Sequence, residues 1–233
     1  MNRRILIAFT LVLFTLGAFA QQRETREVGR FDEVKLRTSA KVYITQGNKN
    51  EVILEGDRDD LEDIRTDVRG GELEISNRRE SGWNIWGSSR SDVNVYITVV
   101  ELEAVTVSGS GDIIGKTLIK ADDFRAAISG SGDIEMEVDA GRLETRISGS
   151  GNIELTGAAK SGMLSISGSG KLLAEDLKVD DFDVRISGSG RGSITVYGDL
   201  DVRISGSGGV YYSGKPTSVN TNVSGSGKVR RIN

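Results

Sequence analysis

The chain has 233 residues, with 30 lysines and arginines against 34 aspartates and glutamates, and a formal net charge of −4 at pH 7. This acidic balance argues against a nucleic-acid partner, because nucleic-acid binders normally carry a basic surface. The chain has no cysteine and no histidine, which removes disulfides, thiolate chemistry and the usual general base at neutral pH. We therefore expect no catalytic residues, no metal site and no cofactor, and we expect that the protein is not an enzyme.

Residues 1–20 have the features of a secretory signal peptide. Two arginines precede an apolar stretch that begins at Ile5, and the stretch ends on the small-x-small sequence at 18–20. Cleavage after Ala20 would leave a mature chain without a membrane span. Residues 21–28 are then expected to be a linker, and the predicted location is secreted, periplasmic or on the outer-membrane surface of a bacterium.

Residues 29–106 are predicted to form irregular β coils that cap a longer stack. Apolar residues alternate with polar ones in short runs, which is the pattern of half-buried strands. The apolar positions are Val34, Leu36, Ala40, Val42, Ile44, Val52, Leu54, Leu73, Ile75, Val93, Val95, Ile97 and Val99.

A polar loop between these strands holds both tryptophans of the chain, Trp83 and Trp86. Two interpretations are open. The tryptophans cover an open end of the stack, since an uncovered coil is an exposed strand edge, or they form a platform for a sugar or a protein partner.

From residue 107 to residue 233 the sequence Ser-Gly-Ser-Gly recurs at intervals of 18 to 21 residues. A fixed period near twenty residues predicts a solenoid in which each repeat is one coil, with about seven coils in this segment. The seven motifs begin at Ser108, Ser129, Ser148, Ser167, Ser187, Ser205 and Ser224.

Apolar residues flank every motif with a period of two. The residue before each motif is valine or isoleucine, and the second residue after it is apolar and bulky in six of seven coils, Gly192 being the exception. This period predicts strands and an all-β fold. If the alternation continues through the motif, the serines point outward and the glycines inward.

The outward positions suggest two charge patterns. The residue after each motif changes from acidic to basic along the stack, which predicts a charge gradient along one edge. Arg146, Arg185 and Arg203 each follow an acid by two residues, so a ladder of exposed ion pairs is expected rather than a site for an anionic glycan. Tyr211 and Tyr212 are weaker candidates for a cap or a contact patch.

Other known sites fit poorly. Asp112, Asp133 and Asn152 would stack at one coil spacing, but they offer few ligands for calcium, which requires six to eight oxygens. The two aspartates would also lie near the separation used by retaining glycosidases, although any aspartate column produces such a pair. The sequence at 110–117 lacks one glycine of a phosphate-binding loop.

Several motifs together resemble the bacterial head GIN domain family, described as auto-transporter adhesins. They are the signal peptide, the opening F-x-x-V-x-L at Phe31, the sequence V-Y-I-T-Q-G that ends at Gly47, G-E-L-E-I-S at 71–76 and the I-S-G-S-G-D-I repeats. The resemblance covers nearly all of residues 29–233. It implies a single-stranded, right-handed parallel β-helix and an extracytoplasmic location.

These patterns favour a non-enzymatic, adhesin-like protein of the bacterial cell envelope, which presents a rigid β-helical surface to a glycan or a cell-surface protein. Two alternatives stay open. One is a structural envelope protein that associates with its own copies, and the other is a glycan-active enzyme built on a β-helix.

Overall fold

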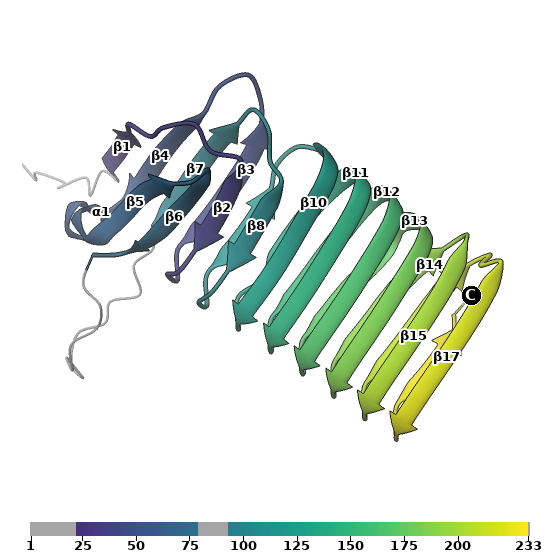
Figure 1. Ribbon diagram of the computed structural model, residues 1–233. Helices are drawn as coiled ribbons and strands as arrows, with labels where there is room; N and C mark the ends of the chain where they lie inside the picture. The colour runs from purple at the N-terminus through teal and green to yellow at the C-terminus, as the bar shows by residue number, and fades with distance from the viewer. Residues whose placement is uncertain (1–21, 79–92, 233) are drawn as a thin grey trace, which may run out of the picture.

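The computed structural model describes residues 22–78 and 93–232, whose strands form one continuous stack of coils (Figure 1). The only helix in these ranges is α1 (Arg58–Asp63). The strands are β1 (Gln22–Arg26), β2 (Glu33–Leu36), β3 (Lys41–Gln46), β4 (Glu51–Gly56), β5 (Ile64–Arg69), β6 (Glu72–Asn77), β7 (Asn94–Val99), β8 (Ala104–Val107), β9 (Asp112–Gly115), β10 (Ile119–Gly130), β11 (Ile134–Gly149), β12 (Asn152–Gly168), β13 (Lys171–Gly188), β14 (Arg191–Val196), β15 (Asp199–Gly206), β16 (Gly209–Gly214), β17 (Ser218–Gly225) and β18 (Lys228–Arg231).

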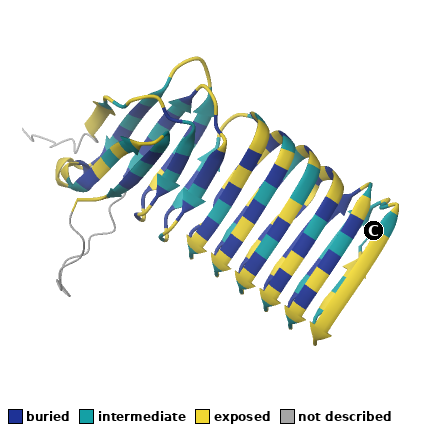
Figure 2. Cartoon of the chain, viewed as in Figure 1, coloured by how far each residue is buried: buried dark blue, intermediate teal, exposed yellow. Residues whose placement is uncertain are grey.

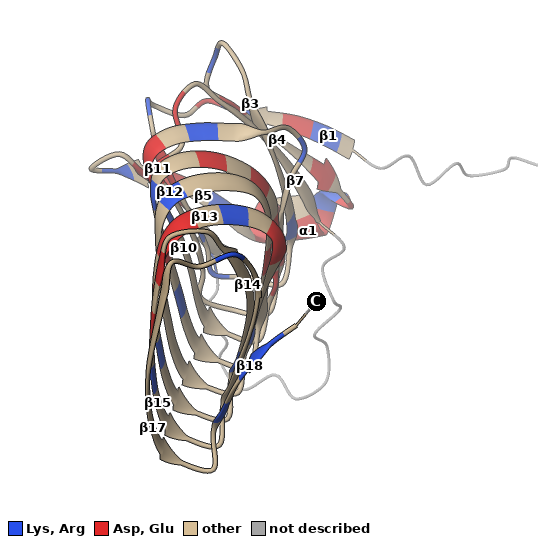
Figure 3. Cartoon of the chain, turned by 90° about the vertical axis from the view of Figure 1, so that its right-hand side faces the viewer, with Lys and Arg blue, Asp and Glu red and all other residues tan. Residues whose placement is uncertain are grey.

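Each repeat coil has one extended segment before its Ser-Gly motif and one after it. Segments of the same kind pair in parallel from coil to coil, with equal positions stacked, as in Ile128 on Ile147 on Ile166. This arrangement confirms the predicted β-solenoid. Figure 3 looks along the stack and shows β15 and β17 on one side, with β14 and β18 on the other.

We name the two sides of the stack by their position relative to the motif. The upstream face contains β8, residues 124–128, 142–147, 161–166 and 181–186 of the long strands, β15 and β17. The downstream face contains β9, residues 134–140, 152–159 and 171–179, β14, β16 and β18.

The core fills the space between the two faces. Buried and exposed residues alternate along the strands (Figure 2), because successive side chains of a strand point to opposite sides. Two glycines interrupt the apolar columns, and larger neighbours occupy the space. A Cβ on Gly162 would lie 2.6 Å from the Phe182 ring, and one on Gly192 would lie 2.9 Å from Leu164 Cδ2.

The Ser-Gly motif forms the turn between the faces. Its serines are exposed, as predicted, and its second glycine is buried. A Cβ on Gly151 would lie 2.1 Å from the carbonyl oxygen of Gly132 in the preceding coil. The first glycine differs from the prediction: Gly149 is only half-buried, but its φ of 135° is one that glycine adopts more readily than other residues.

The N-terminal coils are irregular, as expected, and their order in the stack is not their order in the chain. The coil of β2 and β3 lies between two later ones: β2 pairs with β6 and β8, and β3 pairs with β7 and β9. After β7 the chain therefore crosses the edge of the coil of β2 and β3 before the regular stack begins. We call residues 100–103, which make this connection, the crossing segment.

Antiparallel strands cover this end of the stack. On the downstream side β4 pairs with β7 and β1 pairs with β4, while β5 pairs with β6 on the upstream side. The expected linker at 21–28 thus contains β1. The predicted signal peptide at 1–20 lies outside the described residues. Within 22–78 and 93–232, no helix is both long enough and apolar enough to span a membrane.

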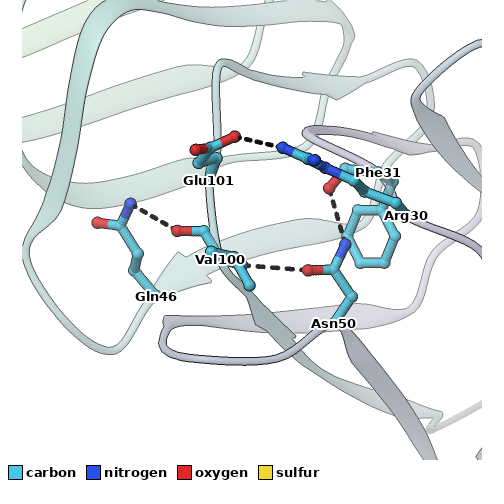
Figure 4. Close-up of polar contacts among 6 residues, drawn as sticks. All are labelled: Arg30, Phe31, Gln46, Asn50, Val100 and Glu101. Atoms are coloured by element: carbon cyan, nitrogen blue, oxygen red, sulfur yellow. Dashed lines mark hydrogen bonds and ion pairs between the residues drawn. The ribbon is translucent and has the colours of Figure 1, made fainter.

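Two side-chain amides hold the crossing segment after β7 (Figure 4). The Asn50 amide donates to the carbonyl of Phe31 (2.9 Å) and accepts from the backbone N–H of Val100 (3.2 Å). The Gln46 amide donates to the carbonyls of Val100 (3.2 Å) and Lys120 (3.1 Å) and accepts from the Lys120 N–H (2.8 Å). Gln46 therefore ties the crossing segment to the start of β10.

Replacing Gly151 with valine should destabilise the repeat coils. The added side chain would collide with the Gly132 carbonyl and with Ile128, and overpacking of this kind costs about 3 kcal/mol. Urea unfolding measures the loss. Ser150→Val, one residue away and exposed, is the matched control and should change stability by less than about 0.5 kcal/mol. Equal effects of the two changes would contradict the assigned packing.

Removing the Gln46 amide should loosen the crossing segment. Gln46→Ala leaves three backbone groups without this partner, and the expected loss of stability is about 1 to 2 kcal/mol. Hydrogen exchange should accelerate at Lys120, whose N–H loses its acceptor. Lys49→Ala removes only an exposed ion pair in the next turn and should have almost no effect.

Candidate functional site

The upstream face carries charges that neutralise one another. Glu144 pairs with Arg146 and lies 3.7 Å from Arg125, and Asp183 lies 3.2 Å from both Arg185 and Arg203. These contacts confirm the predicted ion pairs of Arg146 and Arg185, while Arg203 pairs with Asp183 of the preceding coil instead of Asp201. Because the pairs are largely exposed, each is worth little stability, and the face presents no unbalanced block of charge.

The downstream face carries its charges in two columns that run along the stack beside the Ser-Gly turn. The columns exist because equal positions stack in register from coil to coil. The first column reads Asp112, Asp133, Asn152, Lys171, Arg191, Gly209 and Lys228, and the second reads Ile114, Glu135, Glu154, Leu173, Ser193, Tyr211 and Arg230.

Acids and bases are separated in these columns, which we call the segregated strip. All acids of the strip lie on coils up to Glu154, and all bases lie on coils from Lys171 onward. Among the residues that the structure describes, no ion pair joins any charged side chain of the strip to a partner. Lys41 of the first coil stacks before Asp112 and is the one base at the acidic end of that column.

A shallow groove of about 430 Å³ lies where the strip changes sign. Glu135 and Glu154 line one end, Lys171 and Arg191 line the other, and Leu173 lies between them with 37% of its surface exposed. Glu175, an acid outside the two columns, also borders the groove. The groove therefore offers opposite charges at its two ends and an apolar contact in the middle.

The predicted contact residue Tyr211 lies within the strip, while Tyr212 does not. The Arg191 guanidinium lies over the Tyr211 ring, 5.2 Å from its centre. The ring also lies beside Gly209, which has no side chain, so it fills the gap in the first column. This cation–π contact holds the Arg191 head in place. Tyr212 packs instead against the core at the last coils.

The aspartates of the strip have structural partners. Asp133 Oδ1 accepts hydrogen bonds from the Asn152 backbone N–H (2.8 Å) and side-chain amide (2.9 Å), and Asp112 Oδ1 accepts from the Asp133 N–H (3.4 Å). Each carboxylate thus caps the start of the next coil. Within the described ranges, no group of three or more acidic side chains is arranged to hold a metal ion.

A larger groove of about 920 Å³ follows the other edge of the stack, where the downstream face turns into the next coil. Its floor includes Ala140 and Ala159, and its rim alternates in sign, with lysines at 120, 160 and 178 among aspartates at 122, 123, 139 and 180. Glu101 and Glu103 also line this groove, so its acids outnumber its lysines, and both signs occur together along its length.

The remaining sequence candidates have clear positions. The serines of the seven motifs lie on the exposed turn, where backbone hydrogen bonds such as Ser150 N–H to Gly130 O (3.0 Å) join the coils. Trp83 and Trp86 lie outside the described residues, so their role stays a prediction. The sequence indicated the gradient in the first column, and the second column, the third residue after each motif, is the part of the strip that the sequence patterns did not single out.

A family model described as "Putative auto-transporter adhesin, head GIN domain" matches residues 30–216 of the chain. No curated protein matches this chain in sequence. The matched segment includes the N-terminal coils and most of the Ser-Gly repeats.

Solved structures share the fold at low sequence identity. A "putative adhesin" from Bacteroides fragilis NCTC 9343 aligns with a TM-score of 0.86 and 20% identity, over 92% of this chain and 98% of that one. A "putative lipid binding protein" from Parabacteroides distasonis ATCC 8503 aligns with a TM-score of 0.73 and 22% identity, over 93% and 98%. A "putative adhesin" from Parabacteroides merdae ATCC 43184 aligns with a TM-score of 0.69 and 19% identity, over 93% and 98%.

Calcium should not stabilise the protein, because the Asp133 carboxylate already caps the next coil and its column offers too few oxygens. Thermal unfolding in millimolar calcium and in excess chelator should give the same midpoint. Millimolar magnesium is the control for a general effect of divalent ions. A rise in the midpoint with calcium alone, absent in Asp133→Asn, would establish a site and contradict this interpretation.

Proposed function

Because the chain belongs to the head GIN domain family, we propose that it is a non-enzymatic, adhesin-like protein of the bacterial cell envelope. Its downstream face presents the segregated strip to a glycan or to a protein on a cell surface. The predicted signal peptide supports an extracytoplasmic location, either in the periplasm or outside the cell.

The strip is the observation that carries this proposal. Its charges have no ion-pair partners within residues 22–78 and 93–232, whereas most charges of the upstream face are paired. Segregated charges on a surface steer a complementary partner and fix its orientation. A stacked sheet with a packed core also holds such groups in place at little entropic cost.

The chemistry of the face favours binding over catalysis. A glycosidase requires two carboxyl groups of different acidity beside the substrate. The stacked candidates here, Asp112 and Asp133, both accept hydrogen bonds from the next coil, which makes them coil caps. We therefore do not assign a glycan-active enzyme.

The groove also favours a polar partner. One similar structure is named a lipid binding protein, but charged side chains predominate around this groove and Leu173 is exposed alone among them. An acyl chain would gain little apolar contact there. The proposed partner is therefore a polar or charged surface molecule.

Binding of the labelled protein to bacterial cells, host cells and a glycan array tests the proposal. Lys171→Glu combined with Arg191→Glu removes the basic half of the groove and should reduce attachment about tenfold or more. The matched control is Arg146→Glu with Arg185→Glu, which makes the same charge change on the upstream face and should leave attachment nearly unchanged. Attachment that is absent from every surface, or that is equally reduced in both variants, would overturn the proposal.

A further inference from the structure

We propose that the partner of the segregated strip is the same strip on a second copy of this chain, with the two stacks antiparallel. This inference rests on the proposed function, because it names the molecule that the downstream face contacts. Two copies of the protein would then bind each other directly.

The order of charges makes the strip self-complementary. Acids occupy the coils up to Glu154, and bases occupy the coils from Lys171 to Arg230. A two-fold axis that lies in the interface, perpendicular to the stack, places the acidic end of one copy on the basic end of the other. Parallel stacks in the same register would place acids on acids and bases on bases, so the charge pattern selects the antiparallel arrangement.

The point where the sign changes fixes the register. With the axis between the Glu154 coil and the Lys171 coil, each column faces itself, so Lys171 faces Asn152 of the second copy and lies diagonally across from Glu154 of that copy. Arg191 then faces Asp133 of the second copy one coil further out, with Glu135 beside it in the second column. Leu173 lies beside the axis and provides an apolar contact, with 37% of its surface exposed in the single chain.

The upstream face offers no comparable pairing. Its acids and bases alternate from coil to coil and are joined within one chain, as in the contacts of Asp183 with Arg185 and Arg203. A second copy would have to break these contacts to form new ones. The strip, in contrast, has charges that are free of ion pairs in the part of the chain that the structure describes.

The available area suits a dimer of moderate strength. Seven coils at about 4.8 Å and strands of six residues at about 3.3 Å give a patch of about 700 Å². A standard interface buries about 800 Å² per partner. The contact is largely electrostatic, so salt should weaken it strongly.

Sedimentation of the full mature chain at low and high salt tests the inference. The protein should form dimers at low salt that dissociate as salt rises. Lys171→Glu with Arg191→Glu replaces the two central bases of the strip with acids and leaves Lys228 and Arg230 as its bases, and Glu135→Lys with Glu154→Lys puts two bases into its acidic half. Each variant alone should dimerise at least about tenfold more weakly.

The decisive measurement is the equal mixture of these two variants. The altered coils of one variant then face the oppositely altered coils of the other, so the mixture should form heterodimers about as strongly as the unchanged protein forms dimers. Rescue also shows that both variants are folded. The control variant Arg146→Glu with Arg185→Glu should dimerise normally.

The outcomes separate this inference from the proposed function. A monomer at low salt, or a mixture that stays monomeric, overturns antiparallel pairing. If the basic-half variant still loses attachment to cells in that case, the downstream face remains the contact surface and its partner is another molecule. Dimers that form without attachment to any cell or glycan would support the pairing and overturn the adhesin-like function.

Discussion

The architecture depends on the close approach of successive coils at the Ser-Gly turn. The second glycine of each motif lies so near the carbonyl of the coil before it that no Cβ fits. A Cβ on Gly132 or Gly151 would lie 2.0 Å or 2.1 Å from the carbonyl oxygen of the equivalent glycine in the preceding coil. The first glycine of the motif makes the turn with a positive φ, as at Gly149 and Gly168. Together they fix where each coil starts relative to the last, and a slip of one residue would turn the buried column outward.

Fixed register converts a sequence repeat into surface columns. Positions that are about nineteen residues apart in the chain become neighbours on one face, as Asn152 and Lys171 do. A change from acid to base along the sequence then becomes a change from one end of the face to the other. The same register on the upstream face interleaves Glu144 and Asp183 with arginines and produces pairing. One architecture therefore gives a neutral side and a polarised side.

The repeat made most of the stack predictable from sequence. Its period, the isoleucines before each motif and the outward serines follow from strand alternation, and the structure confirms them. The N-terminal order could not be predicted, because the placing of β2 between β6 and β8 depends on long-range pairing that no local pattern records. Likewise, the turn role of Gly149 was hidden by assuming unbroken alternation. The strip was seen only in part, although its second column is the third residue after each motif and is as readable from the sequence as the first.

Cross-linking between copies tests the polarised face most directly. A zero-length carbodiimide joins an amine to a carboxylate in contact, and an equal mixture of light and heavy isotope-labelled protein distinguishes links between copies from links within one chain. Antiparallel pairing predicts a mixed-isotope link between Lys171 and Glu154, at low salt and not at high salt. Mixed-isotope links that avoid the downstream face, such as links confined to the upstream face, would contradict antiparallel pairing.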